Sequence, residues 1–171
     1  MKRGYTQVYT GNGKGKTTAA LGLALRAAGA GLKVFIAQFI KMGEFSEIKS
    51  LKRYSELITV EQFGLGRFDT KPLPRDFEAA QKGLNKVKTI IFSDEYDVII
   101  LEEANVAVKH GLISEQELVN LIVNKPHDKE LVITGRSASP QIIDHADLVT
   151  EMRLIKHYYQ KGVRARIGIE K

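Results

Sequence analysis

The residues with the clearest chemical potential form a glycine-rich stretch near the amino terminus, TGNGKGKTT at positions 10–18. Gly15, Lys16 and Thr17 match the end of the phosphate-binding pattern G-x-x-x-x-G-K-[ST], but Thr10 stands where its first glycine is expected. In such a loop, backbone N–H groups surround an anion, the lysine adds a positive charge, and the threonine offers a hydroxyl to Mg²⁺. We therefore predict a nucleoside triphosphate site with Lys16 as a catalytic cation.

Two acidic residues follow the most continuous apolar run of the chain. Residues 96–101 read YDVIIL, and Glu102 and Glu103 come directly after them. In phosphate-binding loop proteins, an apolar strand that ends in an acid places a carboxylate beside the metal ion of the nucleotide. Glu102 and Glu103 are therefore candidate ligands of Mg²⁺ (or Mn²⁺), together with Thr17. The alternative is a solvated strand end.

Two cations also follow predicted strands. Arg136 comes after residues 131–134, and Lys41 comes after residues 33–40. Ligands of α/β proteins bind at the carboxyl ends of parallel strands, so both side chains are candidates for contact with phosphate. The planar guanidinium of Arg136 suits phosphate oxygens and gives it a predicted catalytic role. Solvent-exposed positions are the alternative for both residues.

Apolar runs alternate with helical patterns along the chain, which predicts an α/β fold with a mostly parallel sheet covered on both faces. Ser114 opens one helix with a capping-box pattern, SEQE. Strands are expected at residues 5–9, 33–40, 57–63, 96–101 and 131–134, with the fourth at the centre of the sheet. Helices are expected at residues 17–28, 75–91, 114–123 and 140–145. Residues 148–155 and 163–169 are further strand candidates.

Composition narrows the classes of function. The 171 residues suit a single domain, residues 1–171, and no cysteine is present, which excludes disulfides and thiolate chemistry. The net charge of +6 suits anionic ligands, but the charges are dispersed, so we expect no nucleic-acid partner. No apolar run approaches the roughly 18 residues of a membrane span, and no signal peptide pattern is found. We expect a cytoplasmic protein that does not enter a membrane.

Several motifs together resemble one family, the ATP:corrinoid adenosyltransferases of the CobA/CobO/BtuR type. They are GNGKGKTTAA at residues 11–20, QFIK at 38–41, the acid pair at 102–103, ITGR at 133–136, and the segment ADLVTEMRLIKHYYQKGVRARIGIE at 146–170. The similarity covers essentially the whole chain. The loop by itself is moderately specific, and the motifs in combination are very specific.

The resemblance implies a three-layer, RecA-like P-loop NTPase fold and an alkyl transfer. A corrinoid reduced to Co(I) attacks C5′ of ATP, a cobalt–carbon bond forms, and inorganic triphosphate leaves. Because cobalt is the nucleophile, the protein has to neutralise the leaving group and hold C5′ in line rather than supply a nucleophile. The family also implies a role in adenosylcobalamin biosynthesis or salvage, an electron-donor reductase as partner, and a homodimer.

The resemblance further implies roles for individual residues. Phe68 stands where the family has an aromatic residue near the corrinoid, with a core phenylalanine as the alternative. Thr17 and Glu103 would bind the metal, although Glu102-Glu103 replaces the family's usual Asp-Glu pair. The residues that the resemblance implies for holding the triphosphate are Lys14, Gly15, Lys16, Thr17 and Thr18. Further predicted binding residues are Gly11, Asn12, Gly13 and Lys41.

Two other functions are compatible with a phosphate-binding loop. A small-molecule kinase would release ADP and would need a base to activate a hydroxyl, and no such base is evident in the sequence. A nucleotide-dependent module that recognises nucleic acid would need a localised basic face. Identification of the phosphate product separates these alternatives from adenosyl transfer.

Overall fold

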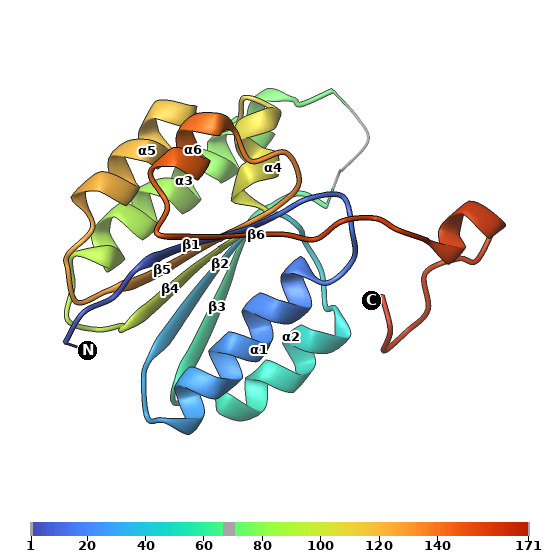
Figure 1. The fold of residues 1–171 in the computed structure, drawn as a ribbon. Helices are drawn as coiled ribbons and strands as arrows, with labels where there is room; N and C mark the ends of the chain where they lie inside the picture. Colours follow the sequence, from blue (N-terminus) through green and yellow to red (C-terminus); the bar gives the residue numbers. More distant parts are fainter. Residues whose placement is uncertain (1, 67–70, 171) are drawn as a thin grey trace.

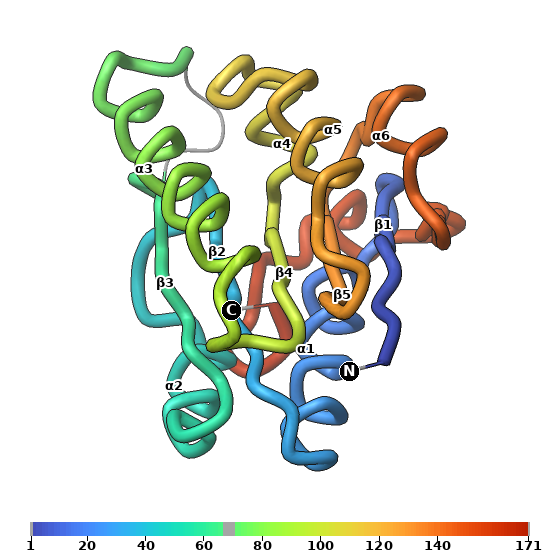
Figure 2. The backbone as a smooth tube through the Cα atoms, turned by 90° about the vertical axis from the view of Figure 1, so that its left-hand side faces the viewer, coloured from blue at the N-terminus to red at the C-terminus, as the bar shows by residue number. Residues whose placement is uncertain are grey.

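Six parallel strands form a central sheet, and helices cover both of its faces (Figure 1). The computed structural model describes residues 2–66 and 71–170. The strands lie in the order β3-β2-β4-β5-β1-β6, and every pairing between neighbours is parallel. Their bounds are β1 Thr6–Thr10, β2 Val34–Ile40, β3 Ile58–Gly64, β4 Val98–Glu102, β5 Glu130–Thr134 and β6 Leu148–Glu151. Because the strands run in one direction, their carboxyl ends meet at one edge of the sheet (Figure 2).

The helices divide between the two faces and enclose a separate apolar core on each. The face covered by α1 and α2 is packed largely with small side chains of α1, such as Ala20 and Ala24. The opposite face is covered by α3, α4, α5 and α6 (Figure 1). The bounds are α1 Lys16–Gly29, α2 Ser46–Leu51, α3 Pro74–Ile91, α4 Ala104–Lys109, α5 Glu115–Asn124 and α6 Pro140–Asp144. The predicted three-layer α/β arrangement is therefore confirmed.

Most of the predicted elements are present, with ends that differ by one or two residues. β2 and β4 are buried along their whole length, which explains their continuous apolar sequences. β4 has strands on both sides and lies at the centre of the sheet, as predicted. The capping box of α5 is also confirmed, since the N–H of Glu117 donates to the Ser114 hydroxyl at 3.2 Å and the Glu117 carboxylate accepts from the N–H of Ser114.

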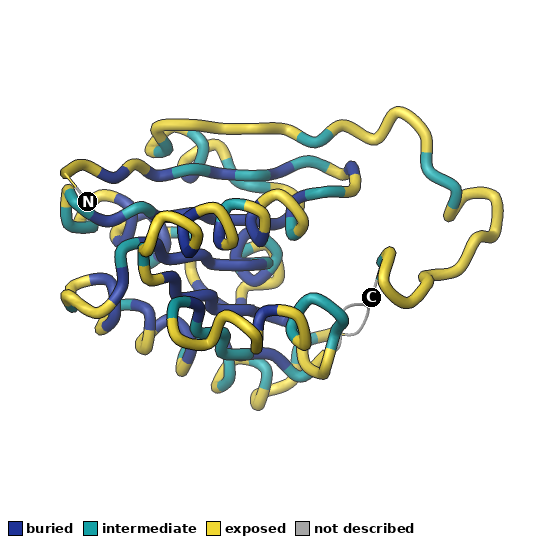
Figure 3. The backbone as a smooth tube through the Cα atoms, turned by 90° about the horizontal axis from the view of Figure 1, so that it is seen from below, coloured by how far each residue is buried: buried dark blue, intermediate teal, exposed yellow. Residues whose placement is uncertain are grey.

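The predictions for the last strands were partly wrong. β6 ends at Glu151 rather than at residue 155, and residues 163–169 form no strand. Gly162 and Gly168 have φ angles of 80° and 78°, which turn the chain, and the backbone N–H of Arg166 donates to a side chain instead of to a neighbouring strand. Residues 152–170, which we call the tail, extend from the body of the protein and are largely exposed (Figure 3). The tail contains a short 3-10 helix, η2, at Tyr158–Lys161.

Candidate active site

The glycine-rich loop, residues 10–18, connects β1 to α1 at the carboxyl edge of the sheet. Thr10 is the last residue of β1, and its buried hydroxyl accepts a hydrogen bond from the N–H of Ala138 at 3.1 Å. Gly11 and Gly15 have φ angles of 92° and 122°, a region that favours glycine. Thr10 is thus a strand residue that ties the loop to the segment after β5, and Gly11 makes the turn that the displaced glycine would otherwise make.

The start of the tail, at Met152, packs against this loop and explains why position 13 is a glycine. The N–H of Gly13 donates to the carbonyl oxygen of Met152 at 2.6 Å. A Cβ atom at Gly13 would lie 2.6 Å from that same oxygen, and one at Gly11 would lie 2.5 Å from it. No side chain fits in either place. The N–H of Gly13 is bonded to protein here, so it does not point freely toward a phosphate.

Lys16 is folded back over the loop. Its ammonium donates to the carbonyl oxygens of Gly11 and Gly13 at 2.7 and 2.8 Å, and the residue is only 8% exposed. Burial lowers the pKa of Lys16, the positive charge of Arg136 lowers it further, and Glu103 partly opposes this change. Within residues 2–66 and 71–170, the hydrogen-bond partners of this desolvated cation are neutral carbonyl groups, so it would gain substantially from an anionic ligand.

Glu102 lies beneath the loop and connects several elements. Its carboxylate is fully buried and accepts from the Thr17 hydroxyl at 2.5 Å, the Lys41 ammonium at 2.5 Å and the Gln38 amide at 2.8 Å. Gln38 lies directly beside Glu102 in the register of β2 and β4. Gln62 of β3 continues this row, because its amide donates to Gln38 at 2.9 Å. Glu102 is therefore committed to holding the side chains of Thr17 and Lys41.

Sequence reasoning included Gln38 in the QFIK motif but gave it no role, and it did not identify Gln62. Gln38 is a fully buried amide within the otherwise apolar strand VFIAQFI, and this anomaly was a usable signal. Gln62 also forms two hydrogen bonds with the backbone of Gly43, at 3.0 and 3.1 Å, which fix the loop after Lys41. The pairing of β2 with β3 had to be known before Gln62 could be connected with the site.

Glu103 differs from its neighbour Glu102 in backbone conformation. Its φ angle is 60°, a left-handed conformation that ends β4 and precedes α4. Burial, and then the charge of Glu102, raise the pKa of the Glu103 carboxyl. Glu103 and Thr17 both line a cavity next to the glycine-rich loop and offer the oxygen ligands that Mg²⁺ prefers. Such a metal usually takes one or two protein oxygens together with phosphates. These donors fit the implied metal ion. Among the described residues no cluster of three or more acidic or histidine side chains suggests another metal site.

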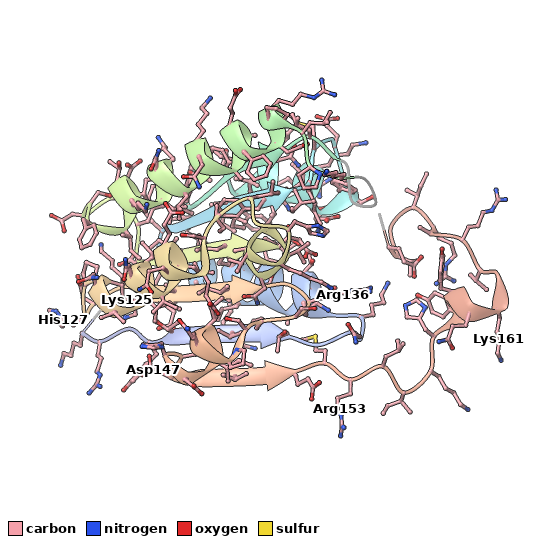
Figure 4. All side chains as sticks on the ribbon, turned by 90° about the horizontal axis from the view of Figure 1, so that it is seen from above. Lys125, His127, Arg136, Asp147, Arg153 and Lys161 are labelled. Carbon is pink, nitrogen blue, oxygen red and sulfur yellow. The ribbon has the colours of Figure 1, made fainter. Side chains whose placement is uncertain are left out.

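The cavity next to the loop has a volume of about 860 Å³. The predicted residues that line it are Gly13, Lys14, Gly15, Lys16, Thr17, Thr18, Lys41, Glu103 and Arg136. Arg136 follows β5 at the carboxyl end of the sheet, on the side where the tail runs (Figure 4). Gly11 and Asn12 belong to the loop but do not line the cavity, and Phe68 lies outside the described residues. Further walls come from α2 and from the tail.

Comparison with known proteins identifies the family to which this site belongs. The family described as ATP:corrinoid adenosyltransferase BtuR/CobO/CobP matches residues 2–170. The chain belongs to this family. It is 36% identical to a corrinoid adenosyltransferase of Escherichia coli K12 over 171 residues, which cover 99% of this chain and 86% of that protein. It is 34% identical to a corrinoid adenosyltransferase of Pseudomonas aeruginosa, with 99% and 84% covered. The resemblance that the sequence motifs indicated is confirmed.

The corrinoid adenosyltransferase of Salmonella typhimurium, CobA, is also 34% identical over 171 residues, with 99% of this chain and 86% of that protein covered. The present chain is therefore an ATP:corrinoid adenosyltransferase, as predicted. Within its described residues we find no helix of the length and apolarity that crossing a membrane requires.

Proposed function

We propose that this enzyme transfers the 5′-deoxyadenosyl group of ATP to the Co(I) centre of a corrinoid, cobalamin or cobyrinic acid a,c-diamide, and releases inorganic triphosphate. An electron pair of cobalt forms the bond to C5′, the C5′–O bond breaks, and its electrons leave with the triphosphate. The observation that carries the proposal is a group of five cations along one cavity, Lys14, Lys16, Lys41, Arg53 and Arg136. Such a group is suited to a polyphosphate leaving group.

Lys16 and Arg136 are the proposed catalytic residues. Charge develops on the triphosphate as the C5′–O bond breaks, and preorganised positive groups stabilise that charge more than they stabilise the bound ATP. Lys16 is already desolvated and held over the loop, so little reorganisation is needed when it exchanges carbonyl oxygens for phosphate oxygens. The exposed guanidinium of Arg136 approaches from the loop after β5.

Thr17 and Glu103 are the proposed holders of Mg²⁺ (or Mn²⁺), which would supply further charge neutralisation to the phosphates when bound. The hydroxyl of Thr17 donates to Glu102 and accepts from the Lys41 ammonium at 3.3 Å, so one of its two lone pairs remains for a metal cation. Glu103 must be ionised to bind a metal, and because its pKa is raised, protons compete with the metal for Glu103 as the pH falls. Glu102 contributes indirectly, because its carboxylate holds the side chains of Thr17 and Lys41 by hydrogen bonds.

The remaining parts of the proposal concern partners and context. Residues 1–171 are proposed as one catalytic domain that acts in the cytoplasm, in adenosylcobalamin biosynthesis or salvage. The chain contains no cysteine, so the electron that gives Co(I) is assigned to a separate reductase. A homodimer is the proposed assembly, and Phe68 is the proposed aromatic contact of the corrinoid.

The test is an anaerobic assay with ATP, Mg²⁺ and chemically reduced corrinoid. We expect stoichiometric triphosphate and a light-sensitive adenosylcorrinoid, whereas ADP as the product, or no turnover, contradicts the proposal. Lys16→Ala should nearly abolish turnover in a folded protein, and Arg136→Ala should lower it. Lys86→Ala, which removes an exposed cation on α3, is the matched control and should retain the wild-type rate. Wild-type kcat/KM in folded Lys16→Ala would remove Lys16 from the mechanism.

A further inference from the structure

The carboxyl-terminal end of the tail returns to the glycine-rich loop and forms one wall of the cavity next to it. The Lys14 ammonium donates to the carbonyl oxygen of Ile169 at 2.8 Å and to the carboxylate of Glu170 at 3.0 Å. Gly168, Ile169 and Glu170 line the same cavity as Lys16 and Thr18. Residues more than 150 positions apart in the sequence therefore meet at the place where ATP is proposed to bind.

The Glu170 carboxylate is surrounded by donors of the kind that bind phosphate. It accepts from the backbone N–H of Arg166 at 2.9 Å, from the guanidinium of Arg166 at 3.2 and 3.3 Å, from the Tyr158 hydroxyl, and from Lys14. The hydrogen bonds of Arg166, followed by that of Tyr158, hold the pKa of Glu170 well below its usual range. The donors thus enclose a carboxylate that is ionised at neutral pH.

We propose that Lys14, Tyr158 and Arg166 form a second binding site for the triphosphate chain, which Glu170 fills while ATP is absent. The guanidinium fork, the phenol and the ammonium suit a phosphate group at least as well as a carboxylate, because a phosphate presents more charged oxygens in a similar geometry. Triphosphate bound by the glycine-rich loop would repel the Glu170 carboxylate, which lies 3.0 Å from the Lys14 ammonium of that loop. Binding of the triphosphate therefore displaces the Glu170 carboxylate, and the phosphate oxygens then accept hydrogen bonds from Lys14, Tyr158 and Arg166.

Two features of the tail make this exchange feasible. The Lys14–Glu170 ion pair is weak for its geometry, since the Lys14 side chain is 42% exposed and water screens exposed pairs. Arg166 has a second contact besides Glu170, because its guanidinium also lies over the Tyr158 ring, 5.0 Å from the centroid. The two donors can therefore remain together when the carboxylate leaves.

The experiment is a calorimetric titration of the full chain with inorganic triphosphate and Mg²⁺, without corrinoid. We expect Arg166→Ala to weaken triphosphate binding by roughly tenfold, as for the loss of a charge-assisted hydrogen bond. Arg164→Ala, which removes the same charge from the same exposed segment, should change the dissociation constant less than twofold. Equal affinities of Arg166→Ala and Arg164→Ala would overturn the proposal.

Glu170→Gln provides an independent measurement with the opposite sign. Removal of the competing negative charge should tighten triphosphate binding several-fold, whereas Glu151→Gln, at an exposed carboxylate on the edge strand, should have a smaller effect. Weaker binding in Glu170→Gln would show that the carboxylate holds the donors in place rather than competing with phosphate, and would overturn the exchange. Circular dichroism checks folding, and Arg166→Lys, which keeps the charge, should recover part of the affinity.

This inference rests on the proposed function, and the two can fail separately. The titration contains no corrinoid, so it reports on the polyphosphate site alone. Wild-type turnover to adenosylcorrinoid together with an unaffected Arg166→Ala titration would refute only the second site. A wild type that binds triphosphate through Arg166 but transfers no adenosyl group would refute only the proposed function.

Discussion

The buried carboxylate of Glu102 offers a sharp test of how the site is held together. Replacement of Lys41 by methionine would leave Glu102 fully buried without the cation that now donates to it at 2.5 Å. Thr17 and Gln38 would still donate hydrogen bonds, but neither carries a charge. We therefore expect the metal-free protein to lose stability because of an uncompensated buried charge, and not merely because of one lost contact.

The magnitude follows from the different exposure of the two partners. Loss of one partner of a buried pair typically costs about 3–5 kcal/mol, and we expect about 3 kcal/mol for Lys41→Met because two neutral donors remain. Glu102→Gln should cost less, about 1–2 kcal/mol, because the Lys41 side chain is 14% exposed and its ammonium can reach water in the cavity. The double variant should lose at least about 2 kcal/mol less than the sum of the single losses.

Urea denaturation at neutral pH with EDTA measures these free energies of unfolding while no divalent cation neutralises the carboxylate. The matched control is Lys52→Met, whose ammonium lies 2.6 Å from the Glu44 carboxylate although both side chains are about two-thirds exposed. That exposed pair should contribute less than about 1 kcal/mol. If Lys41→Met costs no more than Lys52→Met, or if the two losses in the Lys41 and Glu102 cycle are additive, Glu102 does not hold the site by charge.

Three further predictions follow from other features. Burial raises the pKa of Glu103, so the metal-free wild type should lose stability relative to Glu103→Gln as the pH rises through that raised pKa. The measurement is the melting temperature of both proteins from acid to neutral pH, and a constant difference between them would contradict the prediction. Burial opposes ionisation of Glu117, but hydrogen bonds from Ser114, Lys88 and Gln81 outweigh it and lower the pKa of Glu117 to about 2. Glu117→Ala should therefore cost about 1 kcal/mol at neutral pH, a difference that urea denaturation should show to be lost as the pH falls from 4.5 through about 2. Gly13→Ala should lower the free energy of unfolding in urea by about 1–3 kcal/mol and weaken triphosphate binding, since the new Cβ would meet the Met152 carbonyl. Gly22→Ala is the control and should be nearly neutral or stabilising, because the space around Gly22 is open.

The sequence predicted the elements whose own residues determine them. β2 and β4 are continuous apolar strands because both faces are covered, and α5 carries its start signal in Ser114 and Glu117. α2 and α4 were not predicted, because each has six residues, too few for a clear helical period, and neither has a side-chain cap at its start. Residues 163–169 have an apolar pattern typical of a strand but no strand beside them, and only the three-dimensional structure reveals that.

Many of the residues that line the cavity were predictable from the sequence, but the contacts among them were not. The loop, Lys41, the acid pair and Arg136 each follow a strand, so their convergence at one edge followed from parallel pairing. The division of labour between Glu102 and Glu103 did not follow, because it depends on the left-handed turn at Glu103. The contact of Lys14 with the tail joins distant segments, which no local pattern encodes.

These partnerships determine how the site can respond to ATP. Lys16, Lys41 and Lys14 already have oxygen partners, namely loop carbonyls, the buried Glu102 and the tail. Phosphate binding is therefore an exchange, and each lysine will transfer only if the phosphate is a better partner than the present one. Neutral carbonyls are weak competitors for Lys16, and the Lys14–Glu170 pair is weakened by the exposure of the Lys14 side chain, whereas departure of Lys41 would leave Glu102 as an uncompensated buried charge. We expect Lys16 and Lys14 to transfer to the triphosphate, and Lys41 to stay with Glu102 and act on ATP from a fixed position.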